Sequence, residues 1–161
     1  MLVIADPNDS RASRNANALL GLYEMMLNER RPMDAVRKFL APDYIQHNPR
    51  LPDGAEGTGR AFEQRALSNP DMRVVVHRIV ASGDYVCAHV NFMGIYSNDP
   101  GDPGVAGVDI FRFDDDGLIR EHWDVLQPVP ARSESANGNG MFQDGRGENL
   151  PGLDELSRGE M

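Results

Sequence analysis

The sequence lacks paired cysteines and long apolar runs. Cys87 is the one cysteine among 161 residues, so no intrachain disulfide can form, and no CxxC motif offers ligands to a metal. No stretch approaches the roughly 20 apolar residues of a membrane-spanning helix. The opening residues MLVIADPNDS carry an apolar patch that is too short for a signal-peptide core and has no basic residue before it. We therefore expect a cytoplasmic protein that does not contact a membrane.

Basic residues are also fewer than acidic residues. The chain has 16 lysines and arginines and 25 aspartates and glutamates, which gives a net charge of −9. A nucleic-acid-binding surface needs clustered lysine and arginine side chains, so this balance argues against nucleic acid and against an anionic membrane surface. Hydrophobic residues make up 40% of the chain, an ordinary share for a globular protein, and the length suits one domain with a core and a tail.

Helices are predicted in the first half of the chain. In the first of them, apolar residues recur at spacings of three and four, which gives the helix one apolar face. Asn8, Asp9 or Ser10 can cap its start, and Pro32 suits the first turn of the second helix. The three helices are expected at residues 8–30, 33–40 and 60–68, with a glycine-rich loop at 51–60.

Strand patterns follow, and a tail ends the chain. Valine-rich and alternating segments predict strands at residues 72–81, 85–96, 107–113 and 118–127, after a short extended segment at 44–47. Helices followed by antiparallel strands indicate an α+β domain in which the helices cover one face of a curved sheet. We assign residues 1–130 to this domain. Residues 131–161 form a glycine-rich tail that is loosely ordered or packs on the body or on a partner.

The stretch VDIFRFDDDGLIREHWDV holds an aspartate inside an apolar strand. Strand side chains alternate between faces, so Asp109 shares a face with Phe111, and His122 shares a face with Asp124 and Leu126. A two-residue turn would place Asp109 directly opposite His122, whereas a type I turn with a glycine bulge would shift the pairing by one residue. The sequence leaves both registers open.

Asp109 itself has two interpretations. It can lie on an exposed face or pair with Arg112 or Arg120. Alternatively, it lines an apolar cavity beside Phe111, where burial disfavours the charged form of a carboxyl group. A carboxyl group held protonated can donate a hydrogen bond to a substrate oxygen or pass it a proton.

The segment GVDIFRFDDDGLIREHWDVLQPVP, the upstream YIQHNP and the order of helices and strands resemble the SnoaL-like proteins. That family includes polyketide cyclases and predicted aldol-condensing enzymes, and it belongs to the nuclear transport factor two-like superfamily with ketosteroid isomerase. The resemblance covers residues 8 to 130 and the tail stretch SANGNGMF. It implies a cone, in which a bent antiparallel sheet wraps a long helix around a pocket, and a homodimer formed through the outer sheet face. Because this fold hosts many unrelated functions, the resemblance names no substrate.

The resemblance also implies roles for residues. It places Asp109 where ketosteroid isomerase has its protonated aspartic acid. It places His122, Asp124 and Leu126 at positions that line the pocket, which favours the register that pairs Asp109 with His122. In SnoaL-like cyclases a proton is removed next to a carbonyl and the enolate attacks a second carbonyl, so Asp109 is the expected acid/base.

One position departs from ketosteroid isomerase. Where that enzyme carries its aspartate general base, this chain has His47-Asn48-Pro49, so the steroid-isomerase mechanism does not carry over. We expect His47 and His122 to act with Asp109 as catalytic residues. The expected substrate-binding residues are Tyr44, Asn48, His77, His89, Phe111, Asp124 and Leu126.

The predicted function is that of a cofactor-free enzyme acting on an apolar, carbonyl-bearing small molecule as a cyclase, aldolase, isomerase or lyase. No metal is expected, because the four histidines show neither HxH nor HExxH spacing. A non-catalytic module of the same fold that binds a ligand or a protein is the alternative. A metal-dependent hydrolase is a third hypothesis, which predicts stoichiometric zinc or iron.

Overall fold

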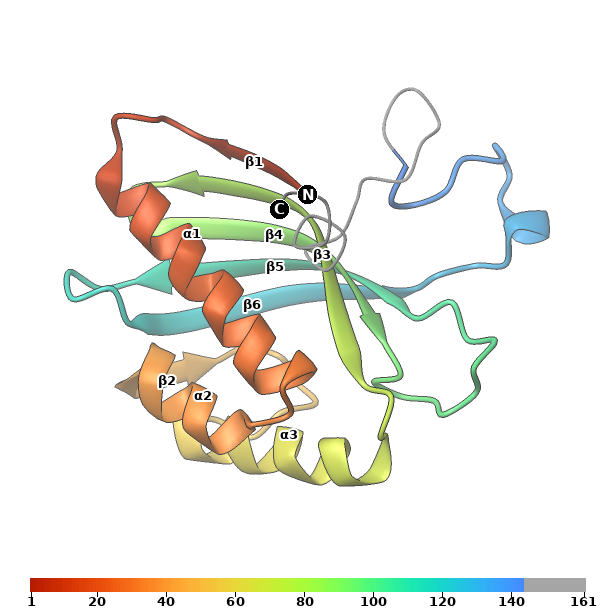
Figure 1. Cartoon of the computed structure of the whole chain (residues 1–161), viewed down its shortest axis with the longest axis horizontal. Coiled ribbons are helices and arrows are strands. Elements are labelled where there is room, and N and C mark those ends of the chain that lie inside the picture. The colour runs from red at the N-terminus through yellow and green to blue at the C-terminus, as the bar shows by residue number, and fades with distance from the viewer. Residues whose placement is uncertain (144–161) are drawn as a thin grey trace, which may run out of the picture.

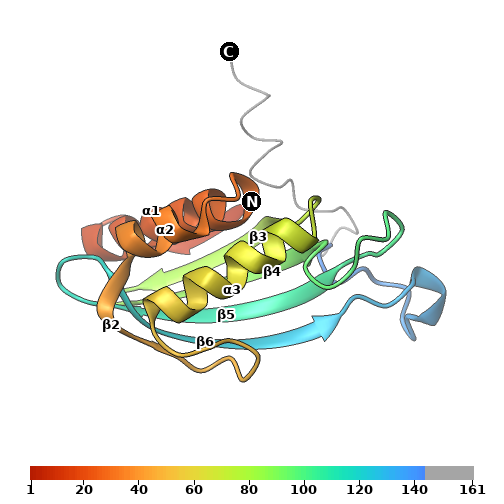
Figure 2. The same ribbon diagram turned by 90° about the horizontal axis from the view of Figure 1, so that it is seen from below.

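Six strands form one curved sheet, and the helices lie against one of its faces (Figure 1). The computed structural model describes residues 1–143. Figure 2 shows α1, α2 and α3 together on one side of the sheet, which confirms the predicted α+β class. The elements in chain order are β1 (Leu2–Ala5), α1 (Ser10–Tyr23), the π-helical turn η1 (Glu24–Asn28), α2 (Pro32–Phe39), β2 (Leu40–Gln46), α3 (Ala55–Ser68), β3 (Arg73–Ser82), β4 (Tyr85–Met93), β5 (Val105–Phe113), β6 (Ile119–Pro128) and the 3₁₀ turn η2 (Arg132–Glu134).

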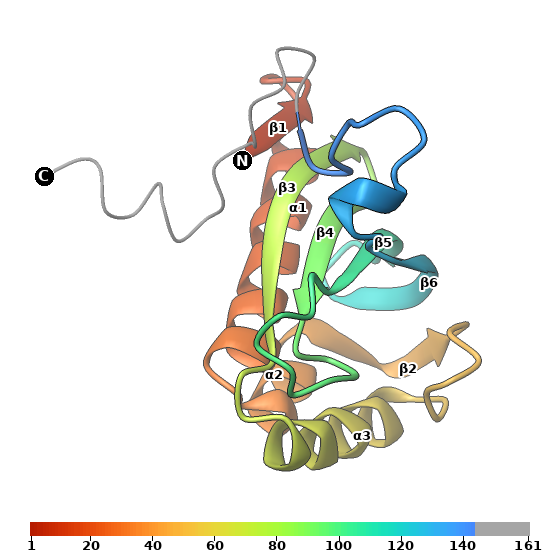
Figure 3. The same ribbon diagram turned by 90° about the vertical axis from the view of Figure 1, so that its right-hand side faces the viewer.

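The strand order is β1-β3-β4-β5-β6-β2. The four central strands pair antiparallel as predicted, but both edge strands run parallel to their neighbours, β1 beside β3 and β2 beside β6. The predicted curved antiparallel sheet is confirmed for the four central strands, and two parallel edge strands extend it. The sequence pattern missed β1, because four residues are too few to show alternation. Figure 3 shows β2 beyond β6 and next to α3, so β2 joins the sheet to the helical layer.

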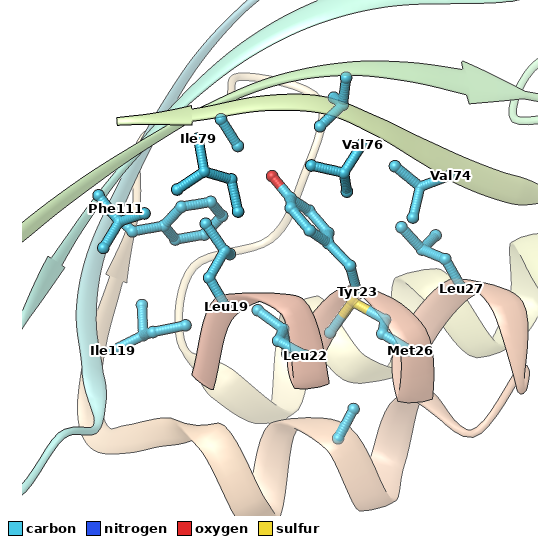
Figure 4. Packing of buried hydrophobic residues seen from close by; sticks show 14 of the residues in the cluster. Leu19, Leu22, Tyr23, Met26, Leu27, Val74, Val76, Ile79, Phe111 and Ile119 are labelled. Atoms are coloured by element: carbon cyan, nitrogen blue, oxygen red, sulfur yellow. The ribbon is translucent and has the colours of Figure 1, made fainter. Parts of the chain in front are cut away.

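Helix α1 and the π-helical turn η1 after it supply the apolar side chains that fill the curve of the sheet. Leu19, Leu22, Tyr23 and Met26 are buried and follow one another at the predicted spacings of three and four. Figure 4 shows these side chains gathered between the helix and its neighbours, with the Tyr23 hydroxyl directed toward the strands. The helix thus delivers one polar atom into an apolar core.

Asp9 fixes the start of α1 to the sheet. Its carboxylate accepts hydrogen bonds from the backbone N–H groups of Ala12, in the first turn of α1, and of Gly83, in the turn between β3 and β4. These two bonds lower the pKa of Asp9. The predicted helix over residues 8–30 is shorter in the structure: α1 ends at Tyr23, and the π-helical turn continues to Asn28.

Helix α3 begins at Ala55, five residues before the predicted start. Glycine has a low helix propensity, so the glycine-rich stretch 51–60 was taken for a loop. Packing explains the glycine at position 59, because a Cβ atom there would come within 2.9 Å of the Met33 sulfur and of a Val36 methyl group. Its lack of a side chain lets α3 approach α2 closely.

The β5–β6 hairpin has neither predicted register. Asp109 lies opposite Asp124, and Phe111 lies opposite His122, because a bulge between Arg112 and Phe113 shifts the pairing near the turn. The observed pairing differs by two residues from the one that would oppose Asp109 to His122. A shift of two keeps each side chain on its predicted face.

The described residues include the first part of the tail. Phe142 stacks on His77 with ring centroids 4.4 Å apart, and Arg78 donates a hydrogen bond of 2.8 Å to the Gln143 carbonyl oxygen. This part of the predicted tail therefore contacts β3, while residues 144–161 lie outside the described residues. Within residues 1–143, no helix combines the length and the apolar character that crossing a membrane requires.

Candidate active site

A cavity of about 60 Å³ lies between α1 and the concave side of the sheet. Its walls are mainly apolar and aromatic. Its polar lining comes from β2 and the segment after it, from β5 and β6, and from Thr58 and Arg65 of α3. A second hollow of about 360 Å³ shares Asn48, Tyr96, Asp124 and Leu126 with the first, so a larger groove adjoins the small cavity. The sequence-predicted residues that line the cavity are Tyr44, Asn48, Asp109, Phe111, His122, Asp124 and Leu126.

Asp109 is buried in this cavity, with 1% of its surface exposed. The Tyr23 hydroxyl donates a hydrogen bond to Oδ2 of the Asp109 carboxyl group. The second oxygen, Oδ1, has no hydrogen-bond partner within residues 1–143. Buried polar atoms are normally satisfied, so Oδ1 is a candidate contact for a ligand.

His122 presents a second buried atom without a hydrogen-bond partner in the described part of the chain. Its Nε2 lies 3.7 Å from Asp109 Oδ1, which is too far for a hydrogen bond. The ring stacks on Phe111 with centroids 4.5 Å apart. Oδ1 and Nε2 therefore face the same small space from neighbouring strands.

Gln46 determines which nitrogen of His122 carries the proton. Its Nε2 donates to the Tyr44 hydroxyl, and its Oε1 accepts from the Asn48 backbone N–H, so the orientation of the amide is fixed. The His122 Nδ1 atom lies 2.9 Å from this same Oε1 and must be the donor. In the neutral ring, Nε2 then carries a free lone pair directed at the Asp109 side of the cavity.

Asp124 completes the polar group. Its Oδ2 accepts a hydrogen bond of 2.5 Å from the Asn48 side-chain amide. Asp109, His122 and Asp124 each offer one possible metal-ligand atom, and these three atoms lie within 4.8 Å of one another. The cavity thus collects three hydrogen-bond acceptors that could hold a cation or a ligand with hydrogen-bond donors.

Two tyrosine hydroxyls lie beside these acceptors. Burial raises the pKa of Tyr23 well above its ordinary value, and the negative charge of Asp109 raises it further. The pKa of Tyr44 is also raised, first by burial and then by Asp109 and Asp124. Both groups therefore stay protonated at neutral pH and act as neutral hydrogen-bonding groups.

The structure places three predicted site residues elsewhere, and their assignment to this cavity is corrected. His47 is exposed on the opposite face, where its Nε2 lies 2.9 Å from Glu121 Oε1 and its ring stacks on Trp123. His77 and His89 lie beside Phe142 of the tail, with ring centroids 4.4 and 5.3 Å from that ring. None of the three is among the residues that line the cavity.

Sequence reasoning missed Tyr23 and Gln46. Tyr23 lies on the apolar face of the first helix, and nothing in that spacing indicates that its hydroxyl contacts Asp109, although a buried tyrosine hydroxyl usually needs a partner. Gln46 carries a clearer signal, because it lies between the predicted residues Tyr44 and Asn48 at the period of a strand. The same alternation directs His47 to the opposite face.

The sequence and the fold are similar to those of known proteins. A family model described as a SnoaL-like domain matches residues 20–122, and no curated protein matches the sequence. Among solved structures, a Bacillus cereus protein provisionally named a polyketide cyclase is 20% identical, with a TM-score of 0.66 over 78% of this chain and 84% of its own. TsrD from Streptomyces laurentii is 26% identical, with a TM-score of 0.55 over 76% of this chain and 92% of its own. IdmH from Streptomyces antibioticus, also provisionally named a polyketide cyclase, is 24% identical, with a TM-score of 0.53 over 70% and 91%.

Proposed function

The chain belongs to the family of SnoaL-like domains, and we propose that it is an enzyme that moves protons next to a carbonyl group of an apolar small molecule. One observation carries this proposal. Asp109 Oδ1 and His122 Nε2 are buried, lie 3.7 Å apart beside an apolar cavity, and lack a hydrogen-bond partner within residues 1–143. An acid and a base held this close together can act on neighbouring atoms of one substrate.

The two residues have complementary roles. The lone pair on His122 Nε2 takes a proton from a carbon next to the substrate carbonyl. Asp109 in its protonated form donates from Oδ1 to the carbonyl oxygen as negative charge develops there, while Tyr23 holds the other carboxyl oxygen. Neither step needs a group from outside the chain.

The enolate has two possible outcomes. In an aldol closure its carbon attacks a second carbonyl carbon, a carbon–carbon bond forms, and the new alkoxide takes the proton back from His122. In an isomerisation, His122 returns the proton to a different carbon. Both outcomes leave Asp109 and His122 as they began, so the substrate decides between cyclase, aldolase and isomerase activity.

The shape of the site supports an apolar substrate that is larger than the inner cavity. The inner cavity of about 60 Å³ has room for the reacting end, and the adjoining groove of about 360 Å³ suits the rest of the molecule. Phe111 and Leu126 offer apolar contacts, and the Asn48 amide is directed at Asp124 in the shared wall.

Exchange of substrate protons into deuterated water tests the proposal. We would follow a panel of enolisable ketones and 1,3-diketones by proton NMR with the full chain and a chelator present. We expect the enzyme to accelerate exchange for some members and Asp109→Asn to lose at least about 100-fold of that acceleration, the low end of general acid–base effects. Glu121→Gln, on the opposite face, is the matched carboxyl-to-amide control. Equal exchange by wild type and Asp109→Asn would contradict the proposal.

The same experiment distinguishes the alternative function. The apolar cavity would serve a non-catalytic binding module equally well. Saturable quenching of tyrosine fluorescence by a ligand, without any exchange catalysis across the panel, would assign the chain to that class, since Tyr23, Tyr44 and Tyr96 line the cavity.

A homodimer and a cytoplasmic location belong to the same proposal. The outer face of the sheet exposes Val80, Val108, Ile110 and Val125, and this apolar surface would be covered if two copies packed face to face. Light scattering of the purified chain checks this: a single-copy mass at micromolar concentration would contradict the dimer. Fluorescence microscopy of a tagged chain tests the location.

A further inference from the structure

We propose that Asp109, His122 and Asp124 form a binding site for a first-row divalent cation. Their candidate ligand atoms lie within 4.8 Å of one another, and Asp109 Oδ1 is 3.7 Å from His122 Nε2. Two ligands of a tetrahedral zinc ion at about 2.0–2.2 Å from the metal lie roughly 3.4 Å apart. A contraction of a few tenths of an ångström between these two atoms would therefore bring them into coordination.

Each of the three residues is held in place by a hydrogen-bond partner. Tyr23 donates to Asp109 Oδ2, Gln46 Oε1 accepts from His122 Nδ1, and the Asn48 amide donates to Asp124 Oδ2. Metal ligands in proteins are held in this way, because the outer partner fixes the ligand's orientation and, for histidine, its tautomer. The Gln46 contact leaves His122 Nε2 with the free lone pair that a metal requires.

The burial and charge of the site give an independent argument. Asp109 and His122 are 1% and 7% exposed, and their inward-facing atoms have no hydrogen-bond partner in the described residues. Asp109 and Asp124 are directly opposed in the β5–β6 ladder, where two ionised carboxylates repel each other. A bound cation would displace the proton that Asp109 carries in the proposed reaction. Within residues 1–143, no lysine or arginine forms an ion pair with either carboxylate. A divalent cation would offset both negative charges and occupy both unsatisfied atoms.

The donor set narrows the identity of the cation. One imidazole nitrogen and two carboxylate oxygens suit zinc, iron or manganese, whereas magnesium and calcium prefer oxygen ligands alone. Zn²⁺ is the most direct probe because it has no redox chemistry and accepts mixed nitrogen and oxygen ligands.

Cation binding and proton transfer use the same atoms. A cation on His122 Nε2 and Asp109 Oδ1 removes the base and the acid of the proposed reaction, so the loaded protein should lose exchange activity. This consequence rests on the proposed function, but the binding itself does not.

Isothermal titration of the full chain with ZnCl₂ tests the site. We expect one Zn²⁺ per chain, and Asp124→Asn and His122→Gln each to weaken that binding by at least tenfold. Asn48→Ala removes the group that orients Asp124 and should weaken it by about 10- to 100-fold, as outer-partner changes do. His89→Gln and His47→Gln, which remove histidines outside the cavity, should leave the affinity unchanged.

Further measurements keep the test decisive if a cavity variant fails to fold. In the wild-type protein, Zn²⁺ should shift the ¹⁵N resonance of His122 Nε2 and leave the other histidine rings in place. Absence of stoichiometric binding, or a loss of binding in His89→Gln in place of His122→Gln, overturns the site. Exchange activity in chelator without zinc binding refutes the cation site alone, and zinc binding without exchange activity refutes the proposed function alone.

Discussion

Two neighbouring residues of β6 form histidine–carboxylate pairs on opposite faces of the sheet. On the outer face, Glu121 accepts from Arg112 at 2.7 and 2.9 Å and lies 2.9 Å from His47 Nε2, so its oxygens are fully used. On the inner face, His122 lies 3.7 Å from Asp109, and the facing atoms have no hydrogen-bond partner in the described residues. The facing atoms of the outer pair all have partners within the protein, whereas the inner pair has atoms that remain available to a ligand. Residue type alone does not separate a structural pair from a functional one; burial and unused hydrogen-bonding capacity do.

The largest expected contrast comes from replacing one histidine on each face by glutamine. His122→Gln should lower the rate of substrate proton exchange by about 100- to 1,000-fold, since it removes the proposed base. His47→Gln should change the rate less than about twofold. NMR exchange rates measured on both variants check this. Equal losses would remove the functional distinction between the two faces.

Tyr23→Phe should have the next largest effect. It deletes the hydroxyl that donates to Asp109 and leaves a buried carboxyl oxygen unsatisfied, which costs about 1–3 kcal/mol of unfolding free energy. Denaturant unfolding measures this cost. Tyr85→Phe removes a hydroxyl from an exposed strand position and should stay within about 0.5 kcal/mol of wild type. A Tyr23→Phe protein as stable as the Tyr85→Phe protein would show that the buried hydrogen bond contributes little to the free energy of unfolding.

Glu121→Gln should have a small effect that depends on pH. Hydrogen bonds from His47 and then Arg112 lower the pKa of Glu121 in the folded protein below its ordinary value of 4.5. A carboxylate with a lowered folded-state pKa stabilises the fold above its unfolded-state pKa, and this contribution disappears as the pH falls through the folded-state pKa. We expect Glu121→Gln to lower the melting temperature at pH 7 by about 3 °C at most. Thermal unfolding from pH 7 to pH 3 should show this difference vanish in acid; a constant difference would contradict it.

Strand alternation predicted the inner face well. It placed Asp109 and Phe111 of β5 and His122, Asp124 and Leu126 of β6 together, because the observed register differs from the favoured one by two residues and so keeps the same faces. The register was wrong, since it depends on a bulge at Arg112 that the turn sequence does not encode uniquely.

The remaining residues depended on contacts that no local pattern reveals. His47 was assigned to the site because it belongs to a family motif. In the structure β2 pairs with β6 so that His47 contacts Glu121 on the outer face of the sheet. His77 has a tail segment, Phe142, packed on it, and such a contact is set by tertiary structure. Tyr23 reaches Asp109 across 86 positions of sequence, so only the fold brings them together.

The ring of His122 offers the most direct test of the central claim, which is that a buried imidazole presents an unprotonated Nε2 to the cavity. Histidine ¹⁵N–¹H correlation spectra of the full chain, in chelator at neutral pH, distinguish the two tautomers. The hydrogen bond to Gln46 predicts a protonated Nδ1 and a bare Nε2, and Nε2 should shift when a 1,3-diketone is added. A proton on Nε2 with Nδ1 bare, or no response of Nε2 to any ligand that binds, would contradict the account.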